Sequence, residues 1–241
     1  MQPTYLPWSG YVDLIDHSDA FVFLDTVAFS RQSWQQRNRI STPQGPLWLT
    51  VPVQRHAGQP ISEVAIDNAR PWRRKHWTSL EASYRRAPFW LQCAPSLRAV
   101  YERQWTSLAD LNMELIRVLC RLARVDANPV LASTLEPLEG GRDGRLVEIC
   151  RRLGGHTYLS PLGALAYLHD DSDFAAAGIE LAFQNYRPQV YPQQGHTFNP
   201  QLSVIDALMN NGPETLSVIR AGRRPSHSLA QARAAVSSDT A

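Results

Sequence analysis

The sequence of 241 residues lacks the features that would place it in a membrane, a zinc protein or a secreted disulfide scaffold. Its three cysteines (Cys93, Cys120 and Cys150) are far apart, and no CxxC pair or Cys/His cluster accompanies them. No stretch approaches the roughly 18 consecutive apolar residues of a membrane helix. The first residues carry no basic, apolar signal segment. We therefore expect reduced thiols, a cytoplasmic location, no metal site and no membrane partner.

The motifs of several enzyme classes are also missing. The chain contains no GxSxG, Walker A, HExxH or GxGxxG pattern, which removes most support for triad hydrolases, P-loop enzymes, zincins and dinucleotide-binding enzymes. The net charge of +2 is too small to argue for a nucleic-acid partner. Arginine is far more frequent than lysine, and arginine suits phosphate or carboxylate ligands as well as structural ion pairs. Composition leaves the cofactor unknown.

What the chain does contain is the pattern of an α/β protein. With 44% hydrophobic residues, a chain of this length can bury a sizeable core. Short apolar runs at 20–25, 156–160 and 178–184 are typical of buried strands. Residues 37–40 and 47–53 flank the turn-forming sequence TPQG and predict a β-hairpin. We expect a mainly parallel, three-layer, Rossmann-like sheet.

Helical periodicity dominates the middle of the chain. Apolar residues at helical spacing predict helices over 72–86 and 105–124, so we expect a helical segment around 70–125 inserted in the α/β fold. The sequence indicates a single domain over 1–221. The last residues, 222–241, are rich in Arg, Ser and Ala and predict a flexible tail.

Three polar segments are candidates for a binding site. In QPTYLPWSGY (2–11), two prolines fix φ and a glycine permits close approach of the backbone, so this loop can cradle an anion or brace the core. In RQSWQQRNRI (31–40), we interpret Arg37 and Arg39 as facing opposite sides of a strand, one into a site, although a polar hairpin edge is an alternative. The segment YRPQVYPQQGHTF (186–198) predicts a loop that orders around a ligand or a packed Ω-loop.

Three residues are candidates for proton transfer or nucleophilic chemistry. His76 lies in a predicted helix, and an unperturbed histidine has a pKa near 6.5, which suits an acid or base, although a single helical histidine is more often structural or exposed. Asp25 and Ser160 each end an expected strand, and in open α/β sheets ligands gather at the carboxyl ends of strands.

Taken in order along the chain, several segments resemble the WbqC-like family. They are QPTYLPWSGY, DAFVFLD, SWQQRNRI, LWLTVPV, WRRKHW, GGHTYLS, VYPQQGHTF and LSVIDALMNNGP, and the resemblance covers about 2–220. It implies a bacterial cytoplasmic protein of surface-polysaccharide or secondary-metabolite pathways. The site residues that it implies are Gln2, Tyr5, Pro7, Trp8, Gly10, Tyr11, Asp25, Trp34, Arg37, Asn38, Trp72, His76, Tyr158, Ser160, Tyr191 and Asp206. Arg39 joins this set as the second arginine of the hairpin.

The chain departs from the family pattern at three places. Family members usually have a short apolar strand before the first loop, whereas this chain begins almost at the loop. Either the true start lies upstream, or the first strand is missing, which would weaken the central sheet. Ala28 stands where a polar residue is usual. Pro161 stands where a glycine is usual, and it stiffens the turn after Ser160.

These observations predict a transferase of glycan, nucleotide-sugar or secondary-metabolite biosynthesis that binds a phosphorylated or amino-sugar substrate. The 2–11 loop would position the substrate, Arg37 or Arg39 would contact its anion, and His76 or Asp25 would transfer a proton. The alternatives are a non-catalytic binding or scaffolding partner of a biosynthetic enzyme, and an acyl- or aminoacyl-transferring enzyme. The enzymatic hypothesis depends on the three polar segments meeting around a common hollow.

Overall fold

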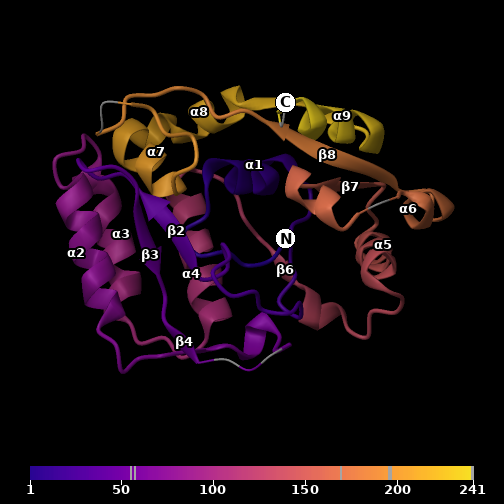
Figure 1. Cartoon of the computed structure of the whole chain (residues 1–241), viewed down its shortest axis with the longest axis horizontal. Helices are drawn as coiled ribbons and strands as arrows, with labels where there is room; N and C mark the ends of the chain where they lie inside the picture. Colours follow the sequence, from indigo (N-terminus) through magenta and orange to yellow (C-terminus); the bar gives the residue numbers. More distant parts are fainter. Residues whose placement is uncertain (55, 57, 169, 195–196, 240–241) are drawn as a thin grey trace.

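The computed structural model describes residues 1–241 except 55, 57, 169, 195–196 and 240–241. The helices are α1 (Ser9–His17), α2 (Trp72–Tyr84), α3 (Trp90–Glu102), α4 (Leu108–Leu122), α5 (Arg142–Arg152), α6 (Ser172–Ala176), α7 (Val204–Asn211), α8 (Thr215–Ala221) and α9 (Leu229–Asp239). The strands are β1 (Val22–Phe23), β2 (Arg37–Ile40), β3 (Leu47–Thr50), β4 (Val53–Gln54), β5 (Ala65–Ile66), β6 (Val130–Leu131), β7 (Thr157–Ser160), β8 (Glu180–Tyr186) and β9 (Arg223–His227). The predicted α/β class is confirmed (Figure 1).

The strands form small, mixed sheets. β1 pairs with β6 in parallel, β2 with β3 and β4 with β5 are antiparallel, and β8 lies between parallel β7 and antiparallel β9. The Met1 carbonyl accepts a hydrogen bond from the Leu24 N–H (2.8 Å), so the first residue lies beside β1. The expected single three-layer parallel sheet is not seen in the described residues. β1 and β6 have only two residues each, and helices supply much of the core.

The helical segment expected around 70–125 contains α2, α3 and α4 (Figure 1). Trp72, His76, Leu80 and Tyr84 recur every fourth residue along α2, and all four are buried, as one helix face requires. At the start of α4, the Ser107 side chain accepts a hydrogen bond from the Asp110 N–H (3.2 Å), a standard N-cap. Within the described ranges, no helix is long and apolar enough to cross a bilayer.

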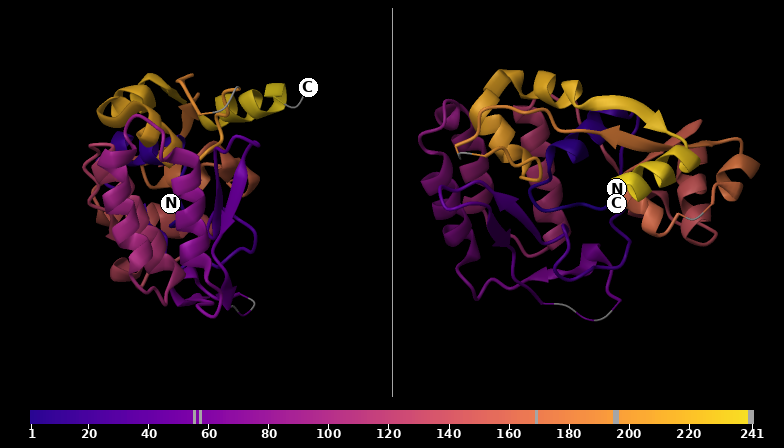
Figure 2. Two further views of the ribbon diagram at one scale, coloured as in Figure 1. Left: turned by 90° about the vertical axis from the view of Figure 1, so that its left-hand side faces the viewer. Right: turned by 45° about the horizontal axis from the view of Figure 1, so that its top comes forward.

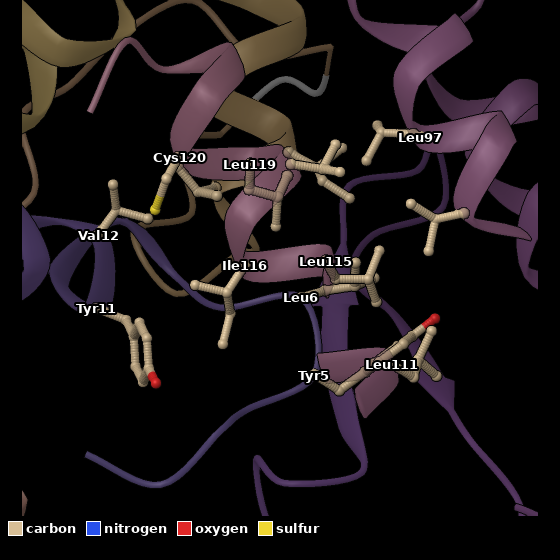
Figure 3. Packing of buried hydrophobic residues seen from close by; sticks show 14 of the residues in the cluster. Tyr5, Leu6, Tyr11, Val12, Leu97, Leu111, Leu115, Ile116, Leu119 and Cys120 are labelled. Carbon is tan, nitrogen blue, oxygen red and sulfur yellow. The ribbon is translucent and has the colours of Figure 1, made fainter. Parts of the chain in front are cut away.

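The main core joins α4 to the first loop of the chain. Leu111, Leu115 and Leu119 of α4 belong to the same buried cluster as Tyr5 and Leu6 (Figure 3). A second buried cluster surrounds β7 and β8 and draws on α5, α6 and α9. These two clusters place the helices α2–α4 on one side of Figure 1 and β7, α5 and α6 on the other, with α1 between them.

The C-terminal segment differs from the flexible tail expected over 222–241. Its described residues form β9 and α9, which lie along β8 (Figure 2). Leu229 and Ala232 are buried in the second cluster. Few side chains of this segment are buried, so its composition resembles that of an unpacked tail. Backbone pairing of β9 with β8 nevertheless fixes the segment in place.

Candidate functional site

The first loop, the β2–β3 hairpin and the segment leading into α7 meet through hydrogen bonds. Asn38 Nδ2 of β2 donates to the Leu6 carbonyl (2.6 Å). The N–H of Val204 donates to the Pro7 carbonyl, and that of Ser203 to the Arg39 carbonyl, both at 2.8 Å. The first loop and the hairpin therefore meet, and the residues that join them at α7 follow the 186–198 segment. The expected convergence of all three polar segments around a common hollow stays a prediction. Positions 195 and 196 of the third polar segment lie outside the described residues.

Contacts at this junction are direct, and the two cavities that we describe lie elsewhere. One cavity of about 420 Å³ is lined by residues of α1, β1, α5 and β7, and another of about 410 Å³ lies at the start of α2. The backbone of the loop is bent, since Leu6 has a φ of 45°, in the left-handed region that costs energy for a residue with a side chain. The Asn38 hydrogen bond to Leu6 helps to hold this conformation.

Side-chain amides hold the first loop in place. Asn112 of α4 donates to the carbonyls of Pro3 (3.1 Å) and Gln35 (2.7 Å), and Asn112 is fully buried. The Gln35 side chain donates to Gln2 Oε1 (2.9 Å), and the Tyr11 hydroxyl donates to the Gln2 carbonyl (2.8 Å). Gln2 and Tyr11, both predicted to bind substrate, therefore form internal hydrogen bonds here.

Gly10 is required by the packing of Trp8. A Cβ atom at Gly10 would lie 2.3 Å from Trp8 Cζ2, a distance that side chains do not tolerate. The Trp8 ring meets Tyr186 edge to face, with ring centroids 5.5 Å apart. The Gly10 carbonyl accepts a hydrogen bond from Gln184 Nε2 of β8 (2.8 Å). The glycine thus permits the close approach that the sequence predicts, and it serves packing.

Tyr5, His76 and Tyr101 form a buried hydrogen-bonded chain. The Tyr5 hydroxyl lies 2.7 Å from His76 Nδ1 and 2.6 Å from the Tyr101 hydroxyl, and the Trp72 ring meets the His76 ring edge to face. Burial lowers the pKa of His76 to about 4, although a hydrogen bond with the Thr50 backbone acts the other way. His76 is therefore neutral at pH 7, with one donor and one acceptor nitrogen. The protonated ring nitrogen of His76 donates to the Thr50 carbonyl, so Nδ1 accepts the hydrogen bond from the Tyr5 hydroxyl.

Asp206 of α7 forms a second buried polar cluster. The hydroxyls of Tyr84 and Tyr191 each donate to its carboxylate at 3.0 Å. Tyr84 also accepts a hydrogen bond from the Ser41 N–H (3.0 Å), and Gln193 Nε2 donates to Tyr191 (3.2 Å). Burial raises the pKa of Asp206 to about 6, against the effect of its hydrogen bonds from the tyrosines. This cluster joins α2, α7 and the third polar segment.

The exposed side of the hairpin carries a different group of residues, which we call the Arg–Trp face: Trp34, Arg37, Arg39, Trp48 and Gln201. The guanidinium carbons of Arg37 and Arg39 lie 4.4 and 5.2 Å from the centroid of the Trp48 ring. The rings of Trp34 and Trp48 are 5.5 Å apart, and they are 48% and 41% exposed. Arg39 donates to the Gln201 side chain (2.8 Å). The face therefore combines two cations with two exposed indoles.

The two arginines share one side of β2, so the interpretation that they face opposite sides is wrong. Side chains two residues apart in a strand point the same way, and it is Asn38 that points into the core. No carboxylate pairs with Arg37 or Arg39 in the described part of the chain. The Nε atoms of both are buried there without a hydrogen-bond partner. A ligand would therefore meet the terminal nitrogens of these guanidinium groups rather than Nε, and guanidinium groups without a carboxylate partner are suited to an anionic ligand.

Several residues predicted to act in the site lie away from the Arg–Trp face. The Asp25 carboxylate accepts a hydrogen bond from the Ser133 N–H (3.0 Å). Tyr158 stacks on Phe174 in the second buried cluster, and Ser160 is fully buried at the end of β7. No group of three or more His, Cys, Asp or Glu that could hold a metal occurs among the residues described.

Sequence reasoning missed two members of the Arg–Trp face. Trp48 lies directly opposite Arg39 in the hairpin register, which the predicted hairpin and its TPQG turn could have indicated. Gln201 follows the third polar segment, and no local pattern marks it. The buried partners Tyr84, Tyr101 and Asn112 were also missed, because helical periodicity does not separate a buried polar residue from a buried apolar one.

Comparison with known proteins gives the family. The model of the WbqC-like protein family matches residues 2–218. The chain therefore belongs to the WbqC-like protein family. It is 33% identical over 225 residues to the uncharacterized protein Rv1507c of Mycobacterium tuberculosis (strain ATCC 25618 / H37Rv), an alignment that covers 91% of this chain and 96% of that protein. No solved structure gives a significant match.

Proposed function

We propose that the protein binds an anionic metabolite that carries a sugar or another flat ring, and that it does so on the Arg–Trp face. One observation carries the proposal: Arg37 and Arg39 lie over Trp48 without a carboxylate partner in the described chain. Structural arginines usually form ion pairs, as Arg223 does with Asp13 (2.8 Å). The hairpin arginines therefore have free donors for phosphate or carboxylate oxygens.

The neighbouring indoles define the rest of the ligand. Trp34 and Trp48 expose large aromatic surfaces, and such surfaces bind the apolar face of a sugar or the plane of a base. Gln201 adds a neutral hydrogen-bonding group at the edge of the face. A nucleotide sugar or a phosphorylated amino sugar combines these chemical features, in line with the substrate class predicted from the sequence.

Binding has more support than group transfer. His76, the predicted acid or base, is buried and neutral and is hydrogen-bonded to the Tyr5 hydroxyl. The Asp25 carboxylate accepts a hydrogen bond from the Ser133 N–H. A transferase would need a proton-transfer group at the Arg–Trp face, so the transferase stays a prediction, as do the acyl-transfer alternative and the cytoplasmic location. A non-catalytic binding partner of a biosynthetic enzyme is the second candidate, favoured by these occupied polar groups.

Isothermal titration calorimetry of purified protein tests the proposal. The probes are UDP-N-acetylglucosamine, glucosamine 6-phosphate and uncharged N-acetylglucosamine. We expect the charged probes to bind, and the Arg37→Ala/Arg39→Ala variant to lose about 100-fold in affinity, because two charge-assisted hydrogen-bonding groups are removed. Trp48→Ala should weaken both charged probes by about 10-fold.

The matched control is Arg85→Ala/Arg86→Ala, which removes the same charge from exposed positions after α2. It should bind within about 2-fold of the wild type. An equal loss in the control, or no binding of either charged probe to the wild type, would contradict the proposal. A further assay separates a transferase from a binding protein. The protein is incubated with UDP-N-acetylglucosamine and with cell extract as the source of acceptors, and chromatography measures the UDP that is released.

A further inference from the structure

The surface cavity between the start of α2 and the end of α3 carries an excess of positive charge. It encloses about 410 Å³, and its lining includes Arg70, Arg73, Arg74, Arg98, Trp77 and Tyr101. Small-molecule sites typically enclose about 300–1,000 Å³. Glu102 is the acidic residue of this lining, so four guanidinium groups face one carboxylate. The cavity thus has the size and the charge of an anion site.

Internal contacts use only part of this positive charge. Arg98 pairs with Glu102 (2.7 Å) and Arg70 with Asp67 outside the lining (3.2 Å). Arg73 donates to the Arg103 carbonyl (2.6 Å), which leaves its charge without a neutralising carboxylate. Arg74 forms no ion pair within the described chain. An anion would therefore be attracted to Arg73 and Arg74.

The position of these arginines on α2 is unfavourable without a ligand. The first turn of a helix favours acidic residues, because its free N–H groups carry partial positive charge. The first turn of α2 has no acidic residue, and Pro71 provides no side-chain cap. Arg73 and Arg74 lie in this turn. An anion in the cavity would offset the repulsion between their charges and the helix end.

Aromatic rings form the rest of the wall. The Trp77 ring contacts the rings of Trp90 and Tyr101, with centroid distances of 5.5 and 6.3 Å. Arg98 lies over Trp77 at 6.0 Å. Tyr101 is buried, whereas Trp77 is partly exposed and held rigidly by these contacts, so Trp77 can stack with a planar group. We propose that this cavity binds a pyrophosphate-bearing ligand with an aromatic ring, such as a nucleoside diphosphate, at a site separate from the Arg–Trp face.

Titration of the full chain with inorganic pyrophosphate, orthophosphate and ADP tests this site. We expect pyrophosphate to bind more tightly than orthophosphate, because it presents more charge to the arginines. ADP should bind more tightly than pyrophosphate, because its base stacks on the aromatic wall, and weaker binding of ADP would overturn the aromatic part of the proposal. The Arg73→Gln/Arg74→Gln variant should weaken pyrophosphate by about 30-fold, because it removes the two charges that have no carboxylate partner in the described chain. Glu102→Gln should tighten it by about 3-fold, because a repulsive carboxylate is removed.

Two controls separate this site from general charge and from the Arg–Trp face. Arg85→Gln/Arg86→Gln removes the same charge at the other end of α2, and Arg37→Ala/Arg39→Ala removes the hairpin cations. Both should bind pyrophosphate within about 2-fold of the wild type. An equal loss in either control, or no pyrophosphate binding, would overturn the proposal. Tighter binding of single-stranded RNA than of ADP with the same dependence on Arg74 would also overturn it, in favour of a nucleic-acid surface.

Discussion

The two sides of strand β2 differ in how their polar groups are used. On one side Asn38 is buried, and both ends of its amide are occupied, by the Leu6 carbonyl and the Arg39 N–H. On the other side Arg37 and Arg39 lie over an exposed indole and have no carboxylate partner in the described chain. Adjacent residues of one polar segment therefore differ: Asn38 stabilises the fold, whereas Arg37 and Arg39 are the residues that we propose for ligand binding.

The same contrast extends beyond the hairpin. The polar residues that brace the first loop (Gln2, Gln35, Asn112) are hydrogen-bonded to one another or to the backbone. Buried polar groups need such partners because an unpaired one costs about 1–3 kcal/mol. Thr4 Oγ1 and Asn112 Oδ1 are nevertheless buried without a partner. Positive charge without a carboxylate partner, beside exposed indoles, therefore distinguishes the Arg–Trp face from the braced loop.

The largest expected effect concerns the buried side and depends on pH. His76 has a folded pKa of about 4, below its usual value near 6.5, so protons favour the unfolded chain. The free energy of unfolding therefore falls as pH drops from about 6.5 to about 4. Asp206 has a folded pKa of about 6, above its usual value, so its contribution falls as pH rises from about 4 to about 6.

These two dependences offset each other in the wild type. The His76→Gln variant should keep only the Asp206 dependence, so its free energy of unfolding falls as pH rises from 4 to 6. The Asp206→Asn variant should keep only the His76 dependence, so its free energy of unfolding increases as pH rises over the same range. Each change should reach up to about 3 kcal/mol. Urea unfolding at pH 4, 5, 6 and 7 measures both slopes. Parallel slopes in the two variants would contradict the assignment.

The second effect tests the hydrogen-bonded chain behind the hairpin. Tyr5→Phe removes the hydroxyl that joins His76 to Tyr101 and leaves two buried groups unpaired, so we expect a loss of about 2 kcal/mol. Tyr101→Phe leaves the Tyr5–His76 hydrogen bond intact and should cost about 1 kcal/mol. Chemical denaturation at pH 7 measures both. A larger loss for Tyr101→Phe would show that Tyr5 is not the central group.

The smallest effect compares neighbours on β2 directly. Asn38→Ala should lower the free energy of unfolding by about 1.5 kcal/mol, because the Leu6 carbonyl loses its partner. Arg37→Ala should change it by no more than about 0.5 kcal/mol, since this exposed side contributes little to folding. Thermal unfolding with calorimetry provides the measurement. Equal losses would remove the distinction between the two sides.

Local elements were predictable from the sequence to a useful degree. The hairpin, the start of α2, the body of α4, and the apolar runs at β1, β7 and β8 follow from periodicity and turn residues, whereas α4 begins three residues after the predicted start. Long-range pairing was not predictable, because strands as short as β1 and β6 depend on packing rather than on their own residues. The expected large sheet therefore appears as small ones.

Part of the candidate site was also predictable. The polar composition of the first loop and the hairpin marked both as parts of one region, and they do meet, through the residues that lead into α7. The burial of His76 was not, because a histidine at helical spacing fits a core face and a cleft equally well. Trp48 escaped notice because an indole in a strand usually signals core, whereas here it is 41% exposed.

The alternation along β2 also limits how this segment can evolve. Inserting or deleting one residue between 31 and 37 would turn the strand over, driving both guanidinium groups into the core and Asn38 into solvent. In the TPQG tip (42–45), Thr42 and Gly45 exchange two backbone hydrogen bonds, but a length change there leaves the facing of Arg37 and Arg39 unchanged. Length changes should therefore accumulate at the tip in related proteins, while the spacing from Trp34 to Arg39 stays fixed.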